Sequence, residues 1–309
     1  MEPITATDIT RRHRNGRGVQ GISLAVQAGR CLGVLGPNGS GKTTLTRLVA
    51  GLDRTDRGAL SVLGSPDHPR PPHLRRRTGV ALDAPAHWET LSGKQNLWFF
   101  ARQSGLNGAD LNQRVNELLA EADLAAQADE PVAAYSFGMR RKLSIIEALA
   151  HDPDLLILDE PSAGADAAFL QRLTQWIADR GARGKTTWIA DNDPDWVARA
   201  ATDAILLREG KLAAGGTVPD LIGSLAAQSR IEILLEEPQQ YPTPDIKGIK
   251  TFTCEANRIT AEVQSDPQLP AELLRWIVAH RGRVRSLEVH SITLYEALTK
   301  KADSQGADR

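Results

Sequence analysis

A glycine-rich segment, GPNGSGKT at residues 36–43, constrains the fold of this chain more than any other feature. It follows a short apolar run, RCLGVLG (30–36), and leads into KTTLTRLVAGL (42–52), where Leu45 and Leu48 share one helical face. A strand, a glycine turn and a helix in this order direct main-chain amides and the positive end of the helix toward phosphate oxygens. The sequence therefore predicts a phosphate-binding loop at the end of a buried strand.

The residue types in this loop define a nucleotide site. Lys42 would neutralise charge on the β- and γ-phosphates, and the Thr43 hydroxyl would ligate Mg²⁺. The glycines let backbone N–H groups turn inward around the phosphate oxygens. The predicted nucleotide-binding residues of this segment are Gly36, Pro37, Asn38, Gly39, Ser40, Gly41, Lys42, Thr43 and Thr44.

A second apolar run, LLILD (155–159), ends on two adjacent carboxylates, Asp159 and Glu160. Acids often end strands simply because the chain reaches the surface there. With a phosphate-binding loop upstream, however, phosphoryl transfer gives both acids a role. We expect Asp159 to help hold Mg²⁺ and Glu160 to act as the general base that activates the attacking water.

Composition excludes several classes of protein. Lys and Arg number 37 against 38 Asp and Glu, so the net charge of -1 provides no overall basic field for nucleic acid. No apolar run of about 18 residues occurs and the N-terminus lacks a signal-like apolar region, so we expect a cytosolic chain that does not cross a bilayer. The two cysteines imply no disulfide framework.

Short strands alternate with helical segments through most of the chain, which predicts a mainly parallel sheet covered on both faces. Near residue 225 the pattern changes to paired strands and a helix, as in a small α+β domain. We expect a nucleotide-binding domain over 1–222 with a helical subdomain at about 86–150, a C-terminal domain over 225–301 and a tail at 302–309. Expected strands lie at 21–29, 58–64, 78–82, 186–190 and 203–216, and expected helices within 93–129 and 167–180.

A third segment, AYSFGMRRKLSIIEALAHDPDLLILDEPSAGAD (134–166), places a Ser-x-Gly turn, a basic amphipathic helix and the two-acid strand in unbroken order. This resembles the signature-to-Walker-B block of ABC ATPases, specifically the ATP-binding subunits of ABC-2-type exporters. The resemblance covers residues 1 to about 220. It implies an α/β fold, namely a P-loop NTPase domain of the ABC type with a helical subdomain, followed by a small C-terminal α+β domain.

The resemblance also implies an activity, cofactors and partners. Such subunits bind ATP and Mg²⁺, dimerise around two nucleotides, and hydrolyse ATP to drive a transmembrane permease from the cytoplasmic, inner face of the membrane. Ser136 and Gly138 would bind the γ-phosphate held by the second subunit, and Asp166 would also contact nucleotide. One chain carries one P-loop and one signature, which favours a homodimer over a heterodimer, and no nucleic-acid partner is expected.

Five positions depart from the pattern of the family. His13 stands where an aromatic residue stacks on adenine, and Asp83 occupies the Q-loop position, where its carboxylate would ligate Mg²⁺. Asn192 replaces a catalytic histidine. Its amide can donate a neutral hydrogen bond but cannot take up a proton and become charged at neutral pH. We therefore expect slowed turnover. The other two departures are Phe137 in the signature and Ala165 in the D-loop.

Two alternatives remain at this point. One is a soluble ABC ATPase acting on ribosomes or DNA, although the chain shows neither tandem nucleotide domains nor a coiled-coil insertion. The other is a nucleotide-gated clamp with little turnover, which Asn192 favours and Glu160 opposes. By the resemblance, the segment 83–100 would border the groove for a coupling helix of the membrane subunit. We expect its aromatic residues to serve the core in preference to that groove: Trp88, Trp98, Phe99 and Phe100.

Overall fold

The structure is a computed structural model that describes residues 2–14, 16–66, 71–84, 86–223, 229–263, 266, 268–291 and 293–307. Contacts divide the chain into two units, one extending to Val218 and including the chain from Ala302, the other Pro219–Lys301. The boundary expected from the sequence, at 222–225, differs by a few residues. Helix α10 (Leu294–Ala307) continues through the described part of the segment that was expected to be a tail.

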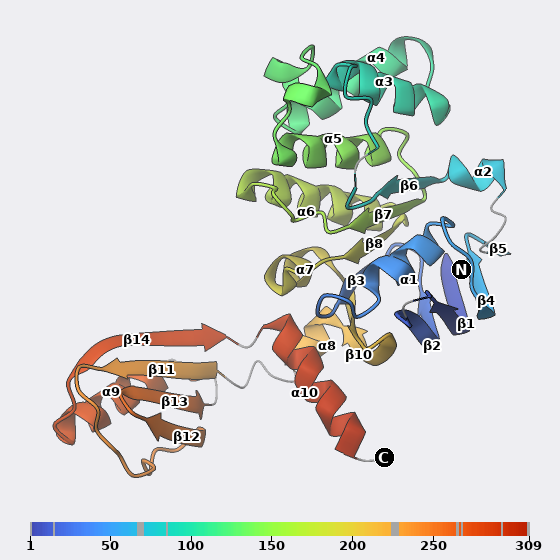
Figure 1. Ribbon diagram of the computed structural model, residues 1–309. Coiled ribbons are helices and arrows are strands. Elements are labelled where there is room, and N and C mark those ends of the chain that lie inside the picture. The colour runs from blue at the N-terminus through green and yellow to red at the C-terminus, as the bar shows by residue number, and fades with distance from the viewer. Residues whose placement is uncertain are drawn as a thin grey trace. The chain divides into compact units, whose positions relative to one another are not determined.

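The first unit is built on a six-stranded sheet with the order β10-β9-β3-β8-β7-β6 (Figure 1). All neighbours are parallel except β9 and β10. Strands β3, β7 and β8 are buried at every position, as expected where helices cover both faces. The strands are β3 (Cys31–Leu35), β6 (Thr78–Ala81), β7 (Leu155–Asp159), β8 (Thr186–Ala190), β9 (Asp203–Arg208) and β10 (Lys211–Thr217).

The segment 203–216 is a hairpin and not the single strand expected from the sequence. Strands β9 and β10 are antiparallel neighbours joined at Glu209 and Gly210. Both turn residues have positive φ, 49° and 75°, which is the backbone that tight hairpin turns require. Apolar residues continue on both sides of this turn and conceal it in the sequence.

A smaller antiparallel sheet with the order β2-β1-β4-β5 completes the core of this unit. Its Ile4, Ile9 and Val62 pack in one cluster with Val34 and Leu155 of the parallel sheet. Strand β1 was not expected from the sequence, since its alternation is broken at Asp8, which has a φ of 49°. The strands are β1 (Ile4–Arg12), β2 (Gly18–Val26), β4 (Arg57–Val62) and β5 (Ser65–Pro66).

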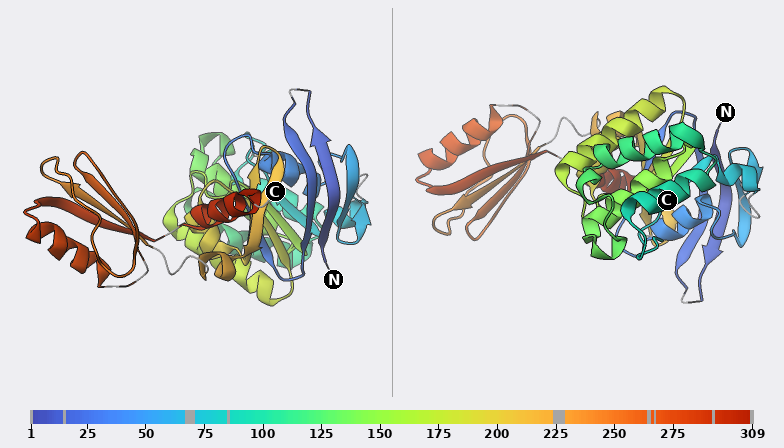
Figure 2. Two further views of the ribbon diagram at one scale, coloured as in Figure 1. Left: turned by 90° about the horizontal axis from the view of Figure 1, so that it is seen from below. Right: turned by 90° about the horizontal axis from the view of Figure 1, so that it is seen from above.

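Some helices of this unit cover the parallel sheet, and α3, α4 and α5 form a helical group (Figure 1). Figures 1 and 2 show α3 and α4 beside α5, in a different part of the unit from the small antiparallel sheet. Ser92 and Gln95 form a capping box that fixes the start of α3. The helices of this unit are α1 (Lys42–Val49), α2 (Pro72–Arg75), α3 (Gly93–Gln103), α4 (Gly108–Glu121), α5 (Phe137–Leu149), α6 (Ala167–Ala182) and α7 (Pro194–Ala200). Helix α8 (Val218–Gly223) begins at the last residue before the second unit.

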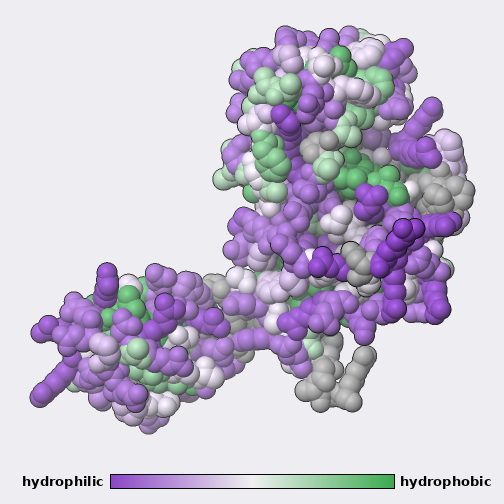
Figure 3. Space-filling model, viewed as in Figure 1, coloured by the Kyte–Doolittle hydropathy of each residue, from purple (hydrophilic) through white to green (hydrophobic). Residues whose placement is uncertain are grey.

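Three of the four aromatic residues around α3 are exposed, so the expectation that they serve the core is wrong for those three, while Phe100 is half-buried. Trp88 is 43% exposed, Trp98 37% and Phe99 39%. The ring of Trp88 packs against Phe99 and Phe100, with centroids 4.4 and 5.4 Å apart. The buried face of α3 consists instead of Gly93, Asn96, Leu97 and Ala101. Figure 3 shows hydrophobic residues gathered at the surface between the helical group and β6.

The second unit has the α+β composition expected from the sequence. Its four antiparallel strands have the order β12-β13-β11-β14. Ile231, Ile233 and Ile259 of the sheet pack against Leu273 and Ile277 of helix α9 (Leu269–Ala279). The strands are β11 (Ser229–Leu235), β12 (Ile249–Glu255), β13 (Arg258–Val263) and β14 (Val284–Ser291). Among the described residues of both units, none of the helices has the length and apolarity needed to span a membrane.

Candidate functional site

Four neighbouring parallel strands bring the predicted site residues to one edge of the sheet. Gly36 follows β3, Asn192 lies just after β8, Glu160 follows β7 and Asp83 lies just after β6. The spatial order of these strands is β3-β8-β7-β6. Ligands of open α/β sheets bind beyond the carboxyl ends of the strands, so the topology assembles the predicted residues at the expected place.

The loop before α1 is shaped to present its amides. Gly41 is the N-cap of α1 and offers no side-chain cap. A Cβ at Gly41 would meet the Gly18 carbonyl oxygen and Val19 Cγ1, each at 2.8 Å, so only glycine fits. Within the described residues, the amides of Gly41, Lys42 and Thr43 donate to no main-chain carbonyl. These free donors at the positive end of a helix fit an anion such as a phosphate.

Lys42 is buried inside the loop, at 5% exposure. Its Nζ donates to the Gly36 carbonyl at 2.7 Å and lies 3.4 Å from the Pro37 carbonyl. Burial lowers the pKa of Lys42, while the carboxylates of Glu160 and Asp159 oppose that shift. The ammonium group is therefore held by the carbonyls of the phosphate-binding loop, within range of the charges of the two predicted acids.

Asp159 provides the strongest indication of a cation site. It is 1% exposed, and neither carboxylate oxygen meets hydrogen-bond geometry with a partner in the described part of the chain. Burial, and then the charges of Glu160 and Asp83, raise the pKa of Asp159 to about 6, while Thr43 and Arg141 partly lower it. A buried carboxylate is costly unless hydrogen bonds or a cation compensate it, and the Thr43 side chain does so only in part. The oxygens of Asp159 and Thr43, with the charge of Asp83 nearby, fit a hard divalent ion.

Glu160 is held in an unusual backbone conformation directly beside this carboxylate. Its φ is 54°, and its amide donates to the Ala190 carbonyl at 2.6 Å. The side-chain amide of Asn192 donates to Glu160 Oε1 at 2.7 Å. The structure thus brings together the two residues that the sequence analysis assigned to catalysis.

Asp191 belongs to the site, although the sequence analysis did not single it out. It is 1% exposed and accepts hydrogen bonds from Ser162 N at 3.0 Å, Ser162 Oγ at 2.6 Å and Asp193 N at 2.8 Å. These bonds join the turn after Glu160 to the turn that carries Asn192. An acid directly after the buried strand β8 was a signal of the same kind as Asp159.

The signature residues lie at the start of α5. Ser136 is the N-cap and accepts a hydrogen bond from Met139 N at 3.2 Å. A Cβ at Gly138 would lie 2.4 Å from the Gly164 carbonyl oxygen, so the helix touches the turn that follows Glu160. No hydrogen bond or ion pair within the described ranges connects Ser136 or Gly138 to the P-loop of the same chain.

Asp166 and His13 occupy the margins of the site. Asp166 caps α6 through Phe169 N at 2.8 Å and pairs with Lys142 at 2.6 Å. The hydrogen bond from Lys142 lowers the pKa of Asp166. His13 is exposed, with Nε2 3.2 Å from Thr44 Oγ1, so it stands above the first turn of α1.

Comparisons with known proteins agree with this geometry. The family model described as "ABC transporter" matches residues 19–163. The Nod factor export ATP-binding protein I of Burkholderia lata is 35% identical over 238 residues, which cover 77% of this chain and 78% of the relative. The chain belongs to the ABC transporter family. The protein of the same name from Cupriavidus pinatubonensis is 36% identical over 219 residues, or 71% of this chain and 67% of the relative.

A solved ABC protein described as "Structure of ATP binding subunit of ABC transporter" has the same fold, with a TM-score of 0.66 and 26% identity. The match covers 72% of this chain and 92% of that structure. These comparisons confirm the predicted ABC-type P-loop fold and the predicted ATPase activity. They also confirm that the chain is an ATP-binding subunit of a transporter. The roles of individual residues stay predictions.

Proposed function

We propose that this chain binds and hydrolyses ATP to power an ABC-2-type membrane transporter through ATP-driven dimerisation. The observation that carries the proposal is the bond from Asn192 to Glu160, formed beside the buried carboxylate of Asp159 and the buried ammonium of Lys42. This arrangement has an acid to take a proton from water, a neutral donor to orient that acid, and a cation for the phosphates.

The residues divide into those that bind nucleotide and those that act on water. The loop Gly36–Thr44 would enclose the phosphates, with His13 beside the base, and Lys42 would bind the β- and γ-phosphates. Thr43, Asp159 and Asp83 would hold Mg²⁺, which when bound neutralises phosphate charge. Glu160 would accept the proton of the attacking water while Asn192 fixes its Oε1.

A second nucleotide-binding subunit would complete the site. Ser136 and Gly138 present a helix N-terminus that makes no described bond to their own P-loop, and a helix N-terminus suits a phosphate of a partner. Asp166, at the start of α6, would approach the nucleotide from the same side. Because one chain carries both halves of the sandwich, a homodimer is favoured. In this proposal residues 1–222 form the nucleotide-binding domain and residues 225–301 form a separate C-terminal domain.

The aromatic cluster of Trp88, Phe99 and the half-buried Phe100 supports a membrane partner. Trp88 and Phe99 are 43% and 39% exposed, and exposed apolar patches mark interaction sites. A transmembrane permease seated there would place the chain at the cytoplasmic, inner face of the membrane. The net charge of -1 gives no support to a nucleic-acid partner. The name of the Burkholderia lata relative favours export.

Copurification and hydrolysis test this proposal together. The chain, expressed with its native membrane partners, should copurify with a multispan protein and release phosphate in a Mg²⁺-dependent reaction. Truncating the aromatic cluster with Phe99→Ala should weaken copurification without changing the affinity for ATP. Absence of Mg²⁺-dependent ATP binding would refute the function. Binding with stable association but no phosphate release, in the presence of all partners, would favour the nucleotide-gated clamp.

A further inference from the structure

Arg141, on helix α5, is a buried charge that the mechanism above does not use. It is 1% exposed, and all three guanidinium nitrogens donate to main-chain carbonyls. Nη1 bonds the Leu82 carbonyl at 2.7 Å, and Nε bonds the Glu160 carbonyl at 3.1 Å. Nη2 reaches the carbonyls of both Asp159 and Glu160. One planar group thus spans two loops of the site.

Burial of this guanidinium is expensive and lowers the pKa of Arg141, while the carboxylates of the site, Asp83 first, oppose that shift. Moving a charge out of water costs several kcal/mol. The Asp83 carboxylate lies 3.9 Å from Nη2 and is itself 60% exposed. An apolar side chain would fill the same volume at lower cost. What an apolar side chain could not supply is the rigid fork of donors, which here reaches three main-chain carbonyls.

The two loops that it joins carry the predicted magnesium ligands and the base. Leu82 directly precedes Asp83, and Asp159 directly precedes Glu160. Glu160 has a φ of 54°, a conformation that costs a non-glycine residue on the order of 1–3 kcal/mol unless its surroundings hold it. Arg141 donates twice to the carbonyl of Glu160 and so helps maintain that conformation.

Helix α5 connects this guanidinium to the signature, since Ser136 caps the helix that carries Arg141. We propose that Arg141 is a positioning residue that sets the backbone of Glu160 and of Leu82–Asp83 from the signature helix. Through Arg141, engagement of the nucleotide of a second subunit at Ser136 aligns the catalytic base. This inference rests on the proposed function and adds the residue that links its two halves.

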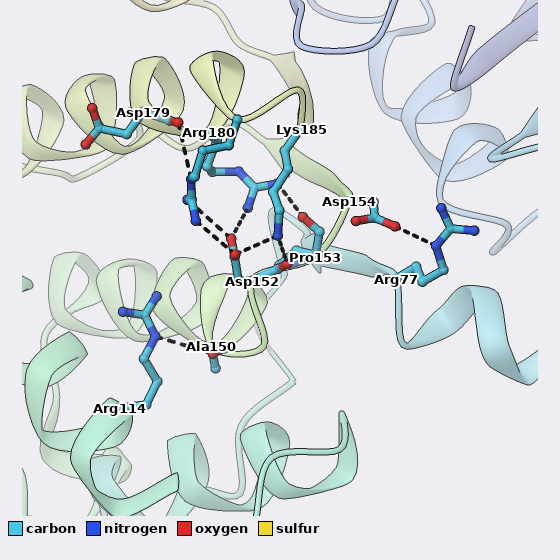
Figure 4. A network of polar contacts seen from close by, with 10 residues as sticks. Arg77, Arg114, Ala150, Asp152, Pro153, Asp154, Asp179, Arg180 and Lys185 are labelled. Carbon is cyan, nitrogen blue, oxygen red and sulfur yellow. Dashed lines mark hydrogen bonds and ion pairs between the residues drawn. The ribbon is translucent and has the colours of Figure 1, made fainter. Parts of the chain in front are cut away.

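Arg180, on helix α6, provides a matched control because it is equally buried, at 2% exposure, and contacts residues that precede strand β7, whereas Arg141 contacts residues at the end of that strand. Its Nη2 donates to the Pro153 carbonyl at 2.8 Å, and Nη1 lies 3.2 Å from Asp152 Oδ1 (Figure 4). Pro153 precedes β7, whereas Asp159 ends it. Loss of Arg180 should perturb the folded chain as much as loss of Arg141, but remote from the site.

The experiment compares Arg141→Gln, Arg141→Lys and Arg180→Gln with the parent chain. Phosphate release and ATP affinity are measured with each protein at the same interval below its melting temperature. We expect Arg141→Gln to lower kcat by about tenfold or more, as for a misaligned base, while KM for ATP stays within about threefold. Arg141→Lys should give an intermediate kcat, since one ammonium cannot span three carbonyls. Arg180→Gln should leave kcat within about twofold.

Amide hydrogen exchange gives a readout that does not need turnover. In Arg141→Gln, the amides of Asp83, Glu160, Ser162 and Ala163 should exchange about tenfold faster than in the parent, and in Arg180→Gln they should not. Equal kcat for parent and Arg141→Gln, or equal exchange in the two glutamine variants, overturns the inference and leaves the proposed function intact. Failure of the parent to bind Mg²⁺-ATP is a different outcome, because it refutes the function itself.

Discussion

Replacing Asn192 with histidine should accelerate ATP hydrolysis. Asn192 Nδ2 donates to Glu160 Oε1 at 2.7 Å, so the position already contacts the proposed base, but through a neutral donor. A charged donor at the same place strengthens a hydrogen bond to a carboxylate or phosphate by about 1–2 kcal/mol. If that difference is expressed in the transition state, Asn192→His gains roughly 5- to 30-fold in kcat.

Two further variants determine whether the hydrogen bond itself matters. Asn192→Ala removes the donor and should slow hydrolysis by about tenfold, corresponding to roughly 1.4 kcal/mol. Asn107→His, on an exposed cap of α4 remote from the site, controls for the added imidazole. It should leave the rate unchanged.

The assay is phosphate release at saturating Mg²⁺-ATP between pH 6 and 8. The gain from Asn192→His should be larger at pH 6 than at pH 8, because an imidazole with a pKa near 6.5 loses its charge over that range. A histidine variant no faster than the parent at pH 6, combined with an unimpaired alanine variant, would show that the contact with Glu160 has no catalytic part.

Three other predictions follow from the same geometry. Glu160→Gln should reduce hydrolysis by at least about 100-fold while ATP affinity is retained, and unchanged hydrolysis would remove Glu160 as the base. Burial lowers the pKa of His151 to about 4. The contribution of the neutral imidazole to the free energy of unfolding is therefore fully present above about pH 6.5 and is lost as the pH drops toward 4, because the unfolded chain binds the proton first. Between pH 7 and 5 the parent should lose about 2 kcal/mol more than His151→Gln in urea unfolding, and parallel losses would contradict this. Gly138→Ala places a Cβ 2.4 Å from the Gly164 carbonyl oxygen; it should lower the free energy of unfolding by about 1–3 kcal/mol, and an unchanged melting temperature would contradict that.

Local sequence patterns predicted the residues whose types are required for phosphoryl transfer. The glycines and Lys42 of the P-loop, and Asp159 and Glu160 at the end of a buried strand, form a combination that few chemistries besides phosphoryl transfer require. The parallel sheet then assembles them because the strands β3, β8, β7 and β6 end at one edge. These parts of the site need no long-range information.

The features missed depend on tertiary contacts. Arg141 resembles any basic residue of a surface helix until its three carbonyl partners are known. Strand β1 is irregular at Asp8, so its alternation is weak, and it is stabilised by pairing with β2 and β4. Trp98 and Phe99 are apolar residues of a kind common in cores, but they lie on the exposed face of α3, whereas Leu97 lies on its buried face. Periodicity alone could not choose between these two faces.

The placement of Lys42 has a consequence for how affinity is distributed. Its ammonium already has two oxygen partners, the carbonyls of Gly36 and Pro37, so engagement of a triphosphate exchanges partners instead of recruiting a free, hydrated charge. Such an exchange releases fewer counterions than capture by a surface lysine. Nucleotide affinity should accordingly depend less on ionic strength than the number of formal charges suggests.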